Sequence, residues 1–171
     1  IIGRLVGSEM CIRDRSYHEY HSDPVNKIME PSSSPFDILN TAFMDSGMCL
    51  KVENNKEIHE PILMMFINSG NDRLMTAPRF HIKLGRSSSL ELFEHHVGYQ
   101  IGNFSNTSIF ITLQENSFFK HTRLQMDSGC AINTGNIHAE QDNSSQYNLS
   151  HFGLGSNLCL LYTSPSPRDD R

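Results

Sequence analysis

Histidine and glutamate side chains are the clearest candidates for chemistry in this sequence, which contains nine histidines. In the stretch "FEHH", strand alternation would place Glu94 and His96 on one face and His95 on the other. Together with His121 and His138 they would form a set of imidazole and carboxylate ligands of the kind that jelly-roll metal sites use. Nothing in their spacing requires that set to assemble. The competing interpretation is a solvent-facing or subunit-facing strand surface, and we therefore predict no metal ligands.

Catalytic groups are not indicated elsewhere. His18 and His21 form an H-x-x-H pair, but the pair lies in a segment rich in proline and serine that offers no helix to fix it. Glu91 and Glu94 are the available carboxylate pair for glycoside cleavage, yet alternation puts them on opposite faces of a strand. The sequence has neither a G-x-S-x-G motif nor a glycine-rich phosphate loop. We predict that the chain is not an enzyme and has no catalytic residues.

The cysteines form no metal or cluster motif. Two of the four lie near the chain ends, which leaves Cys49 and Cys130. Without a C-x-x-C spacing they indicate neither a zinc site nor an iron–sulfur ligand set, and reduced structural thiols are favoured over a disulfide. Cys130 follows the cationic run Lys120–Arg123, which would lower the pKa of a neighbouring thiol, but an ordinary thiol is the favoured interpretation. We assign neither cysteine a role, and cofactor-binding residues stay unknown.

Composition excludes several classes of protein. The 171 residues carry a net charge of −5 and contain no cluster of five or more lysines and arginines, which argues against a nucleic-acid surface. No apolar run approaches the roughly 18–20 residues that span a bilayer. The N-terminal stretch is too short and too interrupted by charge to be a signal peptide. These features predict a cytoplasmic protein that binds neither nucleic acid nor membrane.

Both ends of the chain look like translated sequencing-adapter or linker DNA, namely residues 1–15, "IIGRLVGSEMCIRDR", and residues 159–171, "CLLYTSPSPRDDR". We expect both segments to be disordered, since "TSPSPRDDR" contains no apolar residue that could be buried. Residues 16–34 contain Pro24, Pro31 and a serine run, and we interpret them as a linker. Residues 35–158 would then be the folded part, and we expect the chain to be a fragment of a longer protein.

The folded part begins with a helical pattern and continues with a strand pattern. Ser34 and Pro35 suit an N-cap and a first helical position, and Phe36, Leu39 and Phe43 share one helix face. After Gly47 the period becomes two, in short runs separated by turns rich in glycine and asparagine. The run "PILMMFIN" is apolar on both faces, which predicts burial on both sides, whereas the buried face of "FFKHTRLQM" is not decided by its pattern.

Short strands with frequent turns predict an all-β architecture, for which a sandwich or jelly roll, a closed barrel and a parallel β-helix are the possibilities. Few turns are of the two-residue Asn-Gly or Asp-Gly type that closes antiparallel hairpins. That observation favours the β-helix. However, no strict repeat length is evident, so spacing alone leaves the β-helix and the sandwich at even odds.

Four segments cover residues 35–157 in this order: "PFDILNTAFMDSGMCLKVENNKEIHEPILMMFI", "TAPRFHIKLGRSSSLELFEHHVG", "NTSIFITLQENSFFKHTRLQMD" and "SSQYNLSHFGLGSN". Their order resembles the SufB/SufD family of iron–sulfur assembly scaffolds. The elements typical of the family are a helix ending in "LN-x-AF", a strand led by glycine, an "x-x-P-I" strand and an "R-x-x-I-x-L/V" strand. The entry of one helix followed by one strand favours the SufD branch over the SufB branch.

This resemblance implies the N-terminal part of a right-handed parallel β-helix, preceded by a short helix. It also implies a non-enzymatic scaffold that pairs with a SufB-like protein, binds a SufC-like ATPase and forms a SufBCD complex. The iron–sulfur cluster would be built on the assembled full-length complex and not on this fragment. The cysteine and histidine that handle the cluster in the family lie beyond residue 158, so they have no counterpart here. The alternative function is a β-helical or jelly-roll domain that acts on carbohydrate or binds metal.

Overall fold

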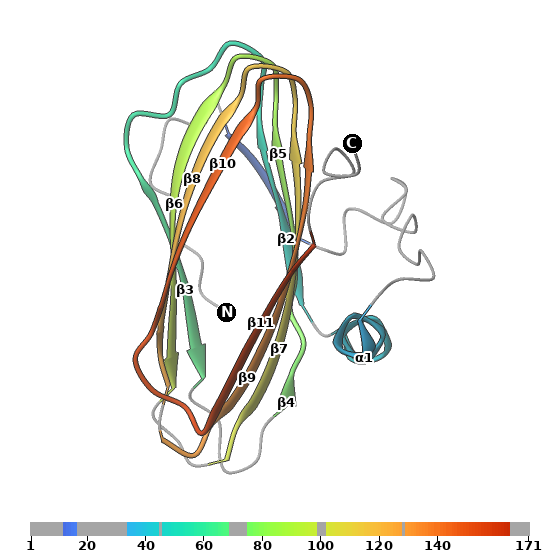
Figure 1. Cartoon of the computed structure of the whole chain (residues 1–171), viewed down its shortest axis with the longest axis vertical. Coiled ribbons are helices and arrows are strands. Elements are labelled where there is room, and N and C mark those ends of the chain that lie inside the picture. The colour runs from blue at the N-terminus through green and yellow to red at the C-terminus, as the bar shows by residue number, and fades with distance from the viewer. Residues whose placement is uncertain are drawn as a thin grey trace.

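The computed structural model describes residues 12–16, 34–44, 46–68, 75–98, 102–127 and 129–164, of which residues 12–16, 68 and 164 are described by their backbone alone. The strands form two sheets that face each other, and one helix lies outside them (Figure 1). The helix is α1 (Pro35–Phe43). The first sheet contains β1 (Ile12–Ser16), β2 (Gly47–Val52), β4 (Met75–Thr76), β5 (Arg79–Leu84), β7 (Phe104–Leu113), β9 (Ile132–Gln141) and β11 (Leu158–Ser164). The second contains β3 (Ile62–Asn68), β6 (Ser89–Gly98), β8 (Phe118–Met126) and β10 (Gln146–Gly153).

The chain passes alternately through the two sheets, and each pass stacks on the one before it. The first sheet has the order β1-β2-β5-β7-β9-β11, with β4 beside β7, and the second has the order β3-β6-β8-β10. Pairing between successive passes is parallel in both sheets. Only β1 pairs antiparallel, with β2, among the described strands. The predicted parallel β-helix is therefore confirmed, and the sandwich and jelly-roll alternatives, which need antiparallel neighbours, are wrong.

One corner of the coil repeats at intervals that the sequence pattern did not reveal. Positive φ angles occur at Asn55, Ser87, Asn116 and Ser144, so successive coils are 32, 29 and 28 residues long at this corner. The turns also bond to one another, because Asn55 N donates to Arg86 O at 2.8 Å and Ser87 N donates to Glu115 O at 3.0 Å. Asparagine and serine adopt this conformation at modest cost, so the corners can stack without glycine.

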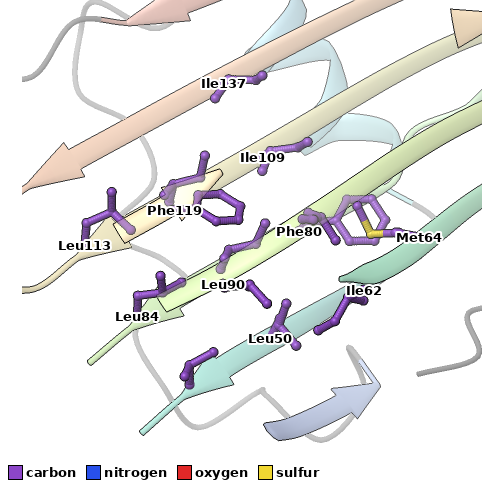
Figure 2. Packing of buried hydrophobic residues seen from close by; sticks show 14 of the residues in the cluster. Leu50, Ile62, Met64, Phe80, Leu84, Leu90, Ile109, Leu113, Phe119 and Ile137 are labelled. Atoms are coloured by element: carbon purple, nitrogen blue, oxygen red, sulfur yellow. The ribbon is translucent and has the colours of Figure 1, made fainter. Parts of the chain in front are cut away.

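The apolar core lies between the two sheets, toward one end of the strands (Figure 2). Inward rows from both sheets meet there, and Leu92, Ile109, Leu113 and Phe119 have no exposed surface. Each such side chain contributes about 1.5–3 kcal/mol when it is buried. Because every coil covers the inward row of its neighbour, the parallel stack itself creates the core.

The outward face of β3 is apolar but exposed. Leu63 and Ile67 on β3 have 50 % and 42 % of their surface exposed, whereas their neighbours Ile62, Met64 and Phe66 are buried. The prediction that β3 is buried on both sides is therefore wrong. Its alternation gives the strand two apolar faces, but only one of them meets the opposite sheet.

The helix begins as the sequence predicts, and its most buried residues are polar. Ser34 is the N-cap, and its hydroxyl accepts from Asp37 N at 3.3 Å. The residues of α1 that are buried are Asp37 and Asn40, whereas Phe43 is 59 % exposed. The most buried positions of the helix are therefore polar, and Phe36 and Leu39 are partly buried beside them. The helix ends at Phe43, and Gly47 begins the next strand.

The terminal segments differ from the expected disorder where the structure describes them. Residues 12–16 form β1 beside β2, and Leu158–Ser164 form β11 beside β9. Most of the predicted linker, residues 17–33, lies outside the described residues. The likeness of both ends to linker DNA stays a prediction.

Candidate functional site

A polar half of the solenoid interior adjoins the apolar core. Along β6 the inward row passes from Leu90 and Leu92 to Glu94 and His96, and along β8 it passes from Phe119 to three polar residues, His121, Arg123 and Gln125. These polar side chains are no more than 1 % exposed. Parallel pairing puts Glu94 beside Arg123 and His96 beside Gln125. Two polar rows therefore face the interior side by side, and we call Glu94, His96, His121 and Arg123 the interior ionic cluster.

The Glu94 carboxylate is the centre of this cluster. His96 Nε2 bonds to Glu94 Oε1, and His121 Nε2 bonds to Glu94 Oε2 at 2.8 Å. Arg123 Nη1 forms an ion pair with Glu94 Oε1 at 3.4 Å. Both oxygens of one buried carboxylate are thus engaged by three cationic or potentially cationic side chains, which compensates the cost of removing its charge from water.

The cluster extends to neighbouring coils on two sides. His121 Nδ1 lies 3.0 Å from the Tyr147 hydroxyl on β10. On the other side, Arg123 Nη2 donates to Asn133 Oδ1 at 3.1 Å, and Asn133 Nδ2 donates to Asp127 Oδ2 at 3.1 Å. The network therefore connects β6, β8, β9 and β10, so it joins the two sheets as well as successive coils.

A glycine on β9 leaves the space that the Arg123 guanidinium occupies. A Cβ atom at Gly135 would lie 2.8 Å from Arg123 Nη1 and 3.0 Å from Leu161 Cδ1. A Cβ atom essentially never has a neighbour under 3.0 Å, so any larger residue would displace the guanidinium or β11. Gly135 is thus required here for close approach and not for a special backbone conformation.

The electrostatics of the cluster hold its carboxyl group in the charged form. Burial alone would raise the pKa of Glu94, but Arg123 and the two histidines hold that pKa well below its usual range. Burial and the Arg123 charge lower the pKa of His96. Burial and the Glu94 charge raise the pKa of Tyr147, so its hydroxyl stays protonated. At neutral pH the cluster therefore contains an ionised carboxylate, a guanidinium and a neutral His96.

Such an arrangement favours orientation and charge balance over bond-breaking chemistry. An exposed nucleophile or general base must reach a substrate, but Glu94, His96 and His121 have no exposed surface. Their bonding atoms are directed at one another. The cluster can hold a hydrogen-bonded network inside the solenoid, and it fixes which strands lie side by side, because a shifted register would leave a buried charge unpaired.

The structure brings together three of the four residues considered as a metal set. Glu94, His96 and His121 meet in the interior ionic cluster, whereas His138 faces outward and bonds to Asp37 Oδ2 at 2.9 Å. The interpretation of these strand residues as solvent-facing or subunit-facing is wrong for the three that are buried. Within the described ranges no group of three or more histidine, cysteine, aspartate or glutamate side chains has the geometry to hold a metal ion.

Sequence reasoning missed Arg123, the cation that balances the cluster. Its signal is present in the sequence, because Arg123 follows Glu94 by 29 residues, the same interval as one coil of the solenoid. The pair Glu91 and Lys120 has the same spacing and forms an ion pair of 2.7 Å on the outer face. Opposite charges one coil apart are therefore a sequence signature of cross-strand pairing.

A second polar cluster attaches α1 to the outer face of the first sheet. Asn40 Nδ2 donates to Asn106 O at 2.8 Å, and Arg79 Nε donates to Asn40 Oδ1 at 3.0 Å. Asp37 accepts from Ser108 Oγ at 3.1 Å as well as bonding to His138. The attachment of this helix is mainly polar, which explains why its buried residues are Asp37 and Asn40.

The remaining candidate residues do not converge on a site. Cys49 is buried and Cys130 is exposed, and both are free cysteines. The cations expected near Cys130 are engaged elsewhere, since Lys120 pairs with Glu91 and Arg123 with Glu94. His18 and His21 lie outside the described residues. No helix in the described part of the chain is long and apolar enough to cross a membrane.

A family model matches most of the solenoid. Residues 65–169, more than half of the chain, match the family model described as SUF system FeS cluster assembly, SufBD core domain. The matched range contains the interior ionic cluster and β4 to β11. It also runs into residues 159–169, which resemble linker DNA in the sequence. No curated protein matches the chain.

Proposed function

Because the chain belongs to the SufBD core domain family of the SUF system of iron–sulfur cluster assembly, we propose that it is a SufD-like, non-enzymatic scaffold component of that system. It acts with a SufB-like protein and a SufC-like ATPase in the cytoplasm. The observation that carries the proposal is the family match over a parallel solenoid.

The surfaces of the solenoid suit a scaffold. Hydrophobic side chains are exposed on the outer face of the second sheet, among them Leu63, Phe93 and Phe152. Exposed apolar groups that gather on one face are typical of protein interaction surfaces. By contrast, the ionisable residues of the interior ionic cluster are buried and bonded to one another. Both features support assembly with other proteins over turnover of a substrate.

Co-purification tests the partners and the SufD assignment together. The tagged chain is produced with the SufB-like, SufD-like and SufC-like proteins of the same genome, each in turn and in combination. A SufD-like chain should retain the SufB-like protein and not the SufD-like one. Retention of only the SufD-like protein would assign the chain to the SufB branch, and retention of neither would contradict the scaffold proposal.

The iron–sulfur cluster is the cargo of the complex, and we propose that the isolated chain does not assemble it. Iron and acid-labile sulfide are measured after anaerobic reconstitution of the chain alone and of its complex with the partners. The complex should acquire both elements in equal amounts and the chain alone neither. A cluster on the isolated chain would contradict this assignment. The metal-binding alternative predicts instead bound metal that is lost in His96→Ala and His121→Ala.

A further inference from the structure

Several buried polar atoms beside the interior ionic cluster lack a hydrogen-bond partner. Within the described residues, His96 Nδ1, Arg123 Nε, Arg123 Nη1 and Thr107 Oγ1 are buried without one. Their side chains are no more than 1 % exposed. Arg123 Nη1 does pair electrostatically with Glu94 at 3.4 Å, but it has no aligned acceptor. Buried polar groups of native proteins are nearly always bonded, to protein or to something else.

These atoms come from neighbouring positions of the two sheets. Arg123 projects from β8 to β9, where its guanidinium lies against Gly135. Thr107 on β7 pairs in register with Gly135, and both face the interior. His96 and Arg123 share the oxygen Glu94 Oε1 as a partner. The unpaired atoms of Arg123 and Thr107 therefore lie at one region between the sheets, which we call the Thr107 region, and His96 adjoins it through the carboxylate oxygen that it shares with Arg123.

Hydrogen-bond stoichiometry defines the ligand that this region would take. An ionised carboxylate only accepts, so His96 donates to Glu94 through Nε2 and keeps Nδ1 as an acceptor. Arginine offers only donors, and the threonine hydroxyl can donate or accept. The group that bonds to Arg123 must therefore accept, and the group that bonds to His96 Nδ1 must donate. Water meets both requirements, as does a small protic anion.

Charge balance decides between these two ligands. Glu94 already neutralises Arg123, and the next carboxylate in the network, Asp127, adds a further negative charge through Asn133. A bound anion would be an additional buried negative charge without a counter-charge, which the interior of a protein disfavours strongly. A metal cation would be repelled by the positive charge of the Arg123 guanidinium. A neutral molecule is therefore favoured.

We propose that the Thr107 region binds ordered water, which bonds to Arg123 and to His96 or Thr107 and completes the hydrogen bonds between the two sheets. Buried water typically makes about three hydrogen bonds to protein groups that would otherwise be unsatisfied. The polar half of the solenoid is then a hydrated interior, in contrast to the dry apolar half around Leu92. This inference does not depend on the role in cluster assembly.

A crystal structure of the chain, with and without a bromide soak, tests the proposal. We expect a water peak within hydrogen-bond distance of an Arg123 nitrogen and of His96 Nδ1 or Thr107 Oγ1, and no anomalous bromide signal there. Direct protein contact at all of these atoms without a peak would overturn the proposal. A bromide peak at the same place would overturn the choice of a neutral ligand.

Magnetic relaxation dispersion of water nuclei gives an independent test in solution. Thr107→Val removes the hydroxyl at nearly constant volume, and we expect it to lower the number of long-lived internal waters by about one. Thr112→Val is the matched control, because Thr112 lies on the outer face of the same strand. An unchanged count in Thr107→Val, or an equal loss in the control, would contradict the proposal.

Discussion

Removal of the Glu94 charge should destabilise the fold far more than the same change at Glu91. Both glutamates lie on β6 and each pairs with a cation on β8. In Glu94→Gln the amide offers one acceptor oxygen in place of two, so an imidazole N–H and the Arg123 guanidinium lose their acceptor. Breaking a buried ion pair by removing one partner costs about 3–5 kcal/mol. The Glu91–Lys120 pair is half-exposed, and such pairs are worth about 0–1 kcal/mol.

Urea denaturation followed by circular dichroism measures this difference. Because the urea dependence of small proteins is about 1–3 kcal/mol per molar, Glu94→Gln should lower the midpoint by roughly 2 M. Glu91→Gln should move it by a few tenths of a molar at most. Single domains have only about 5–15 kcal/mol of stability, so a loss of this size could unfold the single variant. The double variant Glu94→Gln with Arg123→Met is therefore measured as well.

The double variant distinguishes loss of a charge from loss of packing. Uncharged residues of similar volume often replace a buried ion pair at little or no cost, so the double variant should recover much of the loss. The reasoning is refuted if Glu94→Gln costs no more than Glu91→Gln. It is also refuted if adding Arg123→Met to Glu94→Gln lowers the free energy of unfolding by as much as Arg123→Met does in the unaltered chain.

Four further predictions follow from the same structure. Gly135→Ala should lower the melting temperature by several degrees or more, because the added methyl group lies 2.8 Å from the Arg123 guanidinium and overpacking costs about 1–3 kcal/mol; scanning calorimetry measures it, and a neutral effect would disprove the close contact. Leu92→Ala should cost about 2–5 kcal/mol, whereas Leu63→Ala on the exposed face should cost much less, and equal costs in denaturant melts would contradict the assigned faces. Asp37→Asn should speed amide exchange in α1 without speeding it in the core strands, and uniform acceleration would show that the helix is not a separate unit. Stability should fall as the pH drops below 6.5, because the lowered pKa of His96 makes the unfolded state take up protons first; stability that rises with acidification would reverse this sign.

The pH prediction has a second stage at lower pH. A group whose pKa is lowered on folding contributes stability above its unfolded value and loses it as the pH falls. For His96 that loss begins near pH 6.5, and for Glu94 it begins near pH 4.5. Both groups therefore act in the same direction, and the fold should be acid-labile in two steps.

Alternation and turn residues were enough to predict the strands and their corners, but not which side of a strand is inside. A period of two divides a strand into two faces and is silent on which one meets the opposite sheet. On β3 both faces are apolar, and Leu63 nevertheless lies outside. On β8 the face with Arg123 is more polar than the other, yet it is the inner one. Which face of a strand is buried depends on the side chains that it meets across the interior, and these side chains belong to other coils.

The candidate site was only partly predictable for the same reason. Local alternation puts Glu94 and His96 on one face, but only residue type suggests His121 and His138 as companions, and of these only His121 joins them. The role of Arg123 depends on the coil length, which varies from 28 to 32 residues and so escapes a search for a strict repeat. The helix face depends on the sheet beneath α1, where Arg79 and Ser108 select polar partners from the helix.

The central claim is that parallel stacking turns the polar rows of β6 and β8 into the interior, with Glu94 as their shared acceptor. Titration of the His96 imidazole by NMR in the intact chain tests it most directly. Burial and the Arg123 charge should keep His96 neutral at pH values where a free histidine is protonated, well below its ordinary pKa of 6.5. A His96 signal that titrates at 6.5 would show a solvated side chain and contradict the buried arrangement.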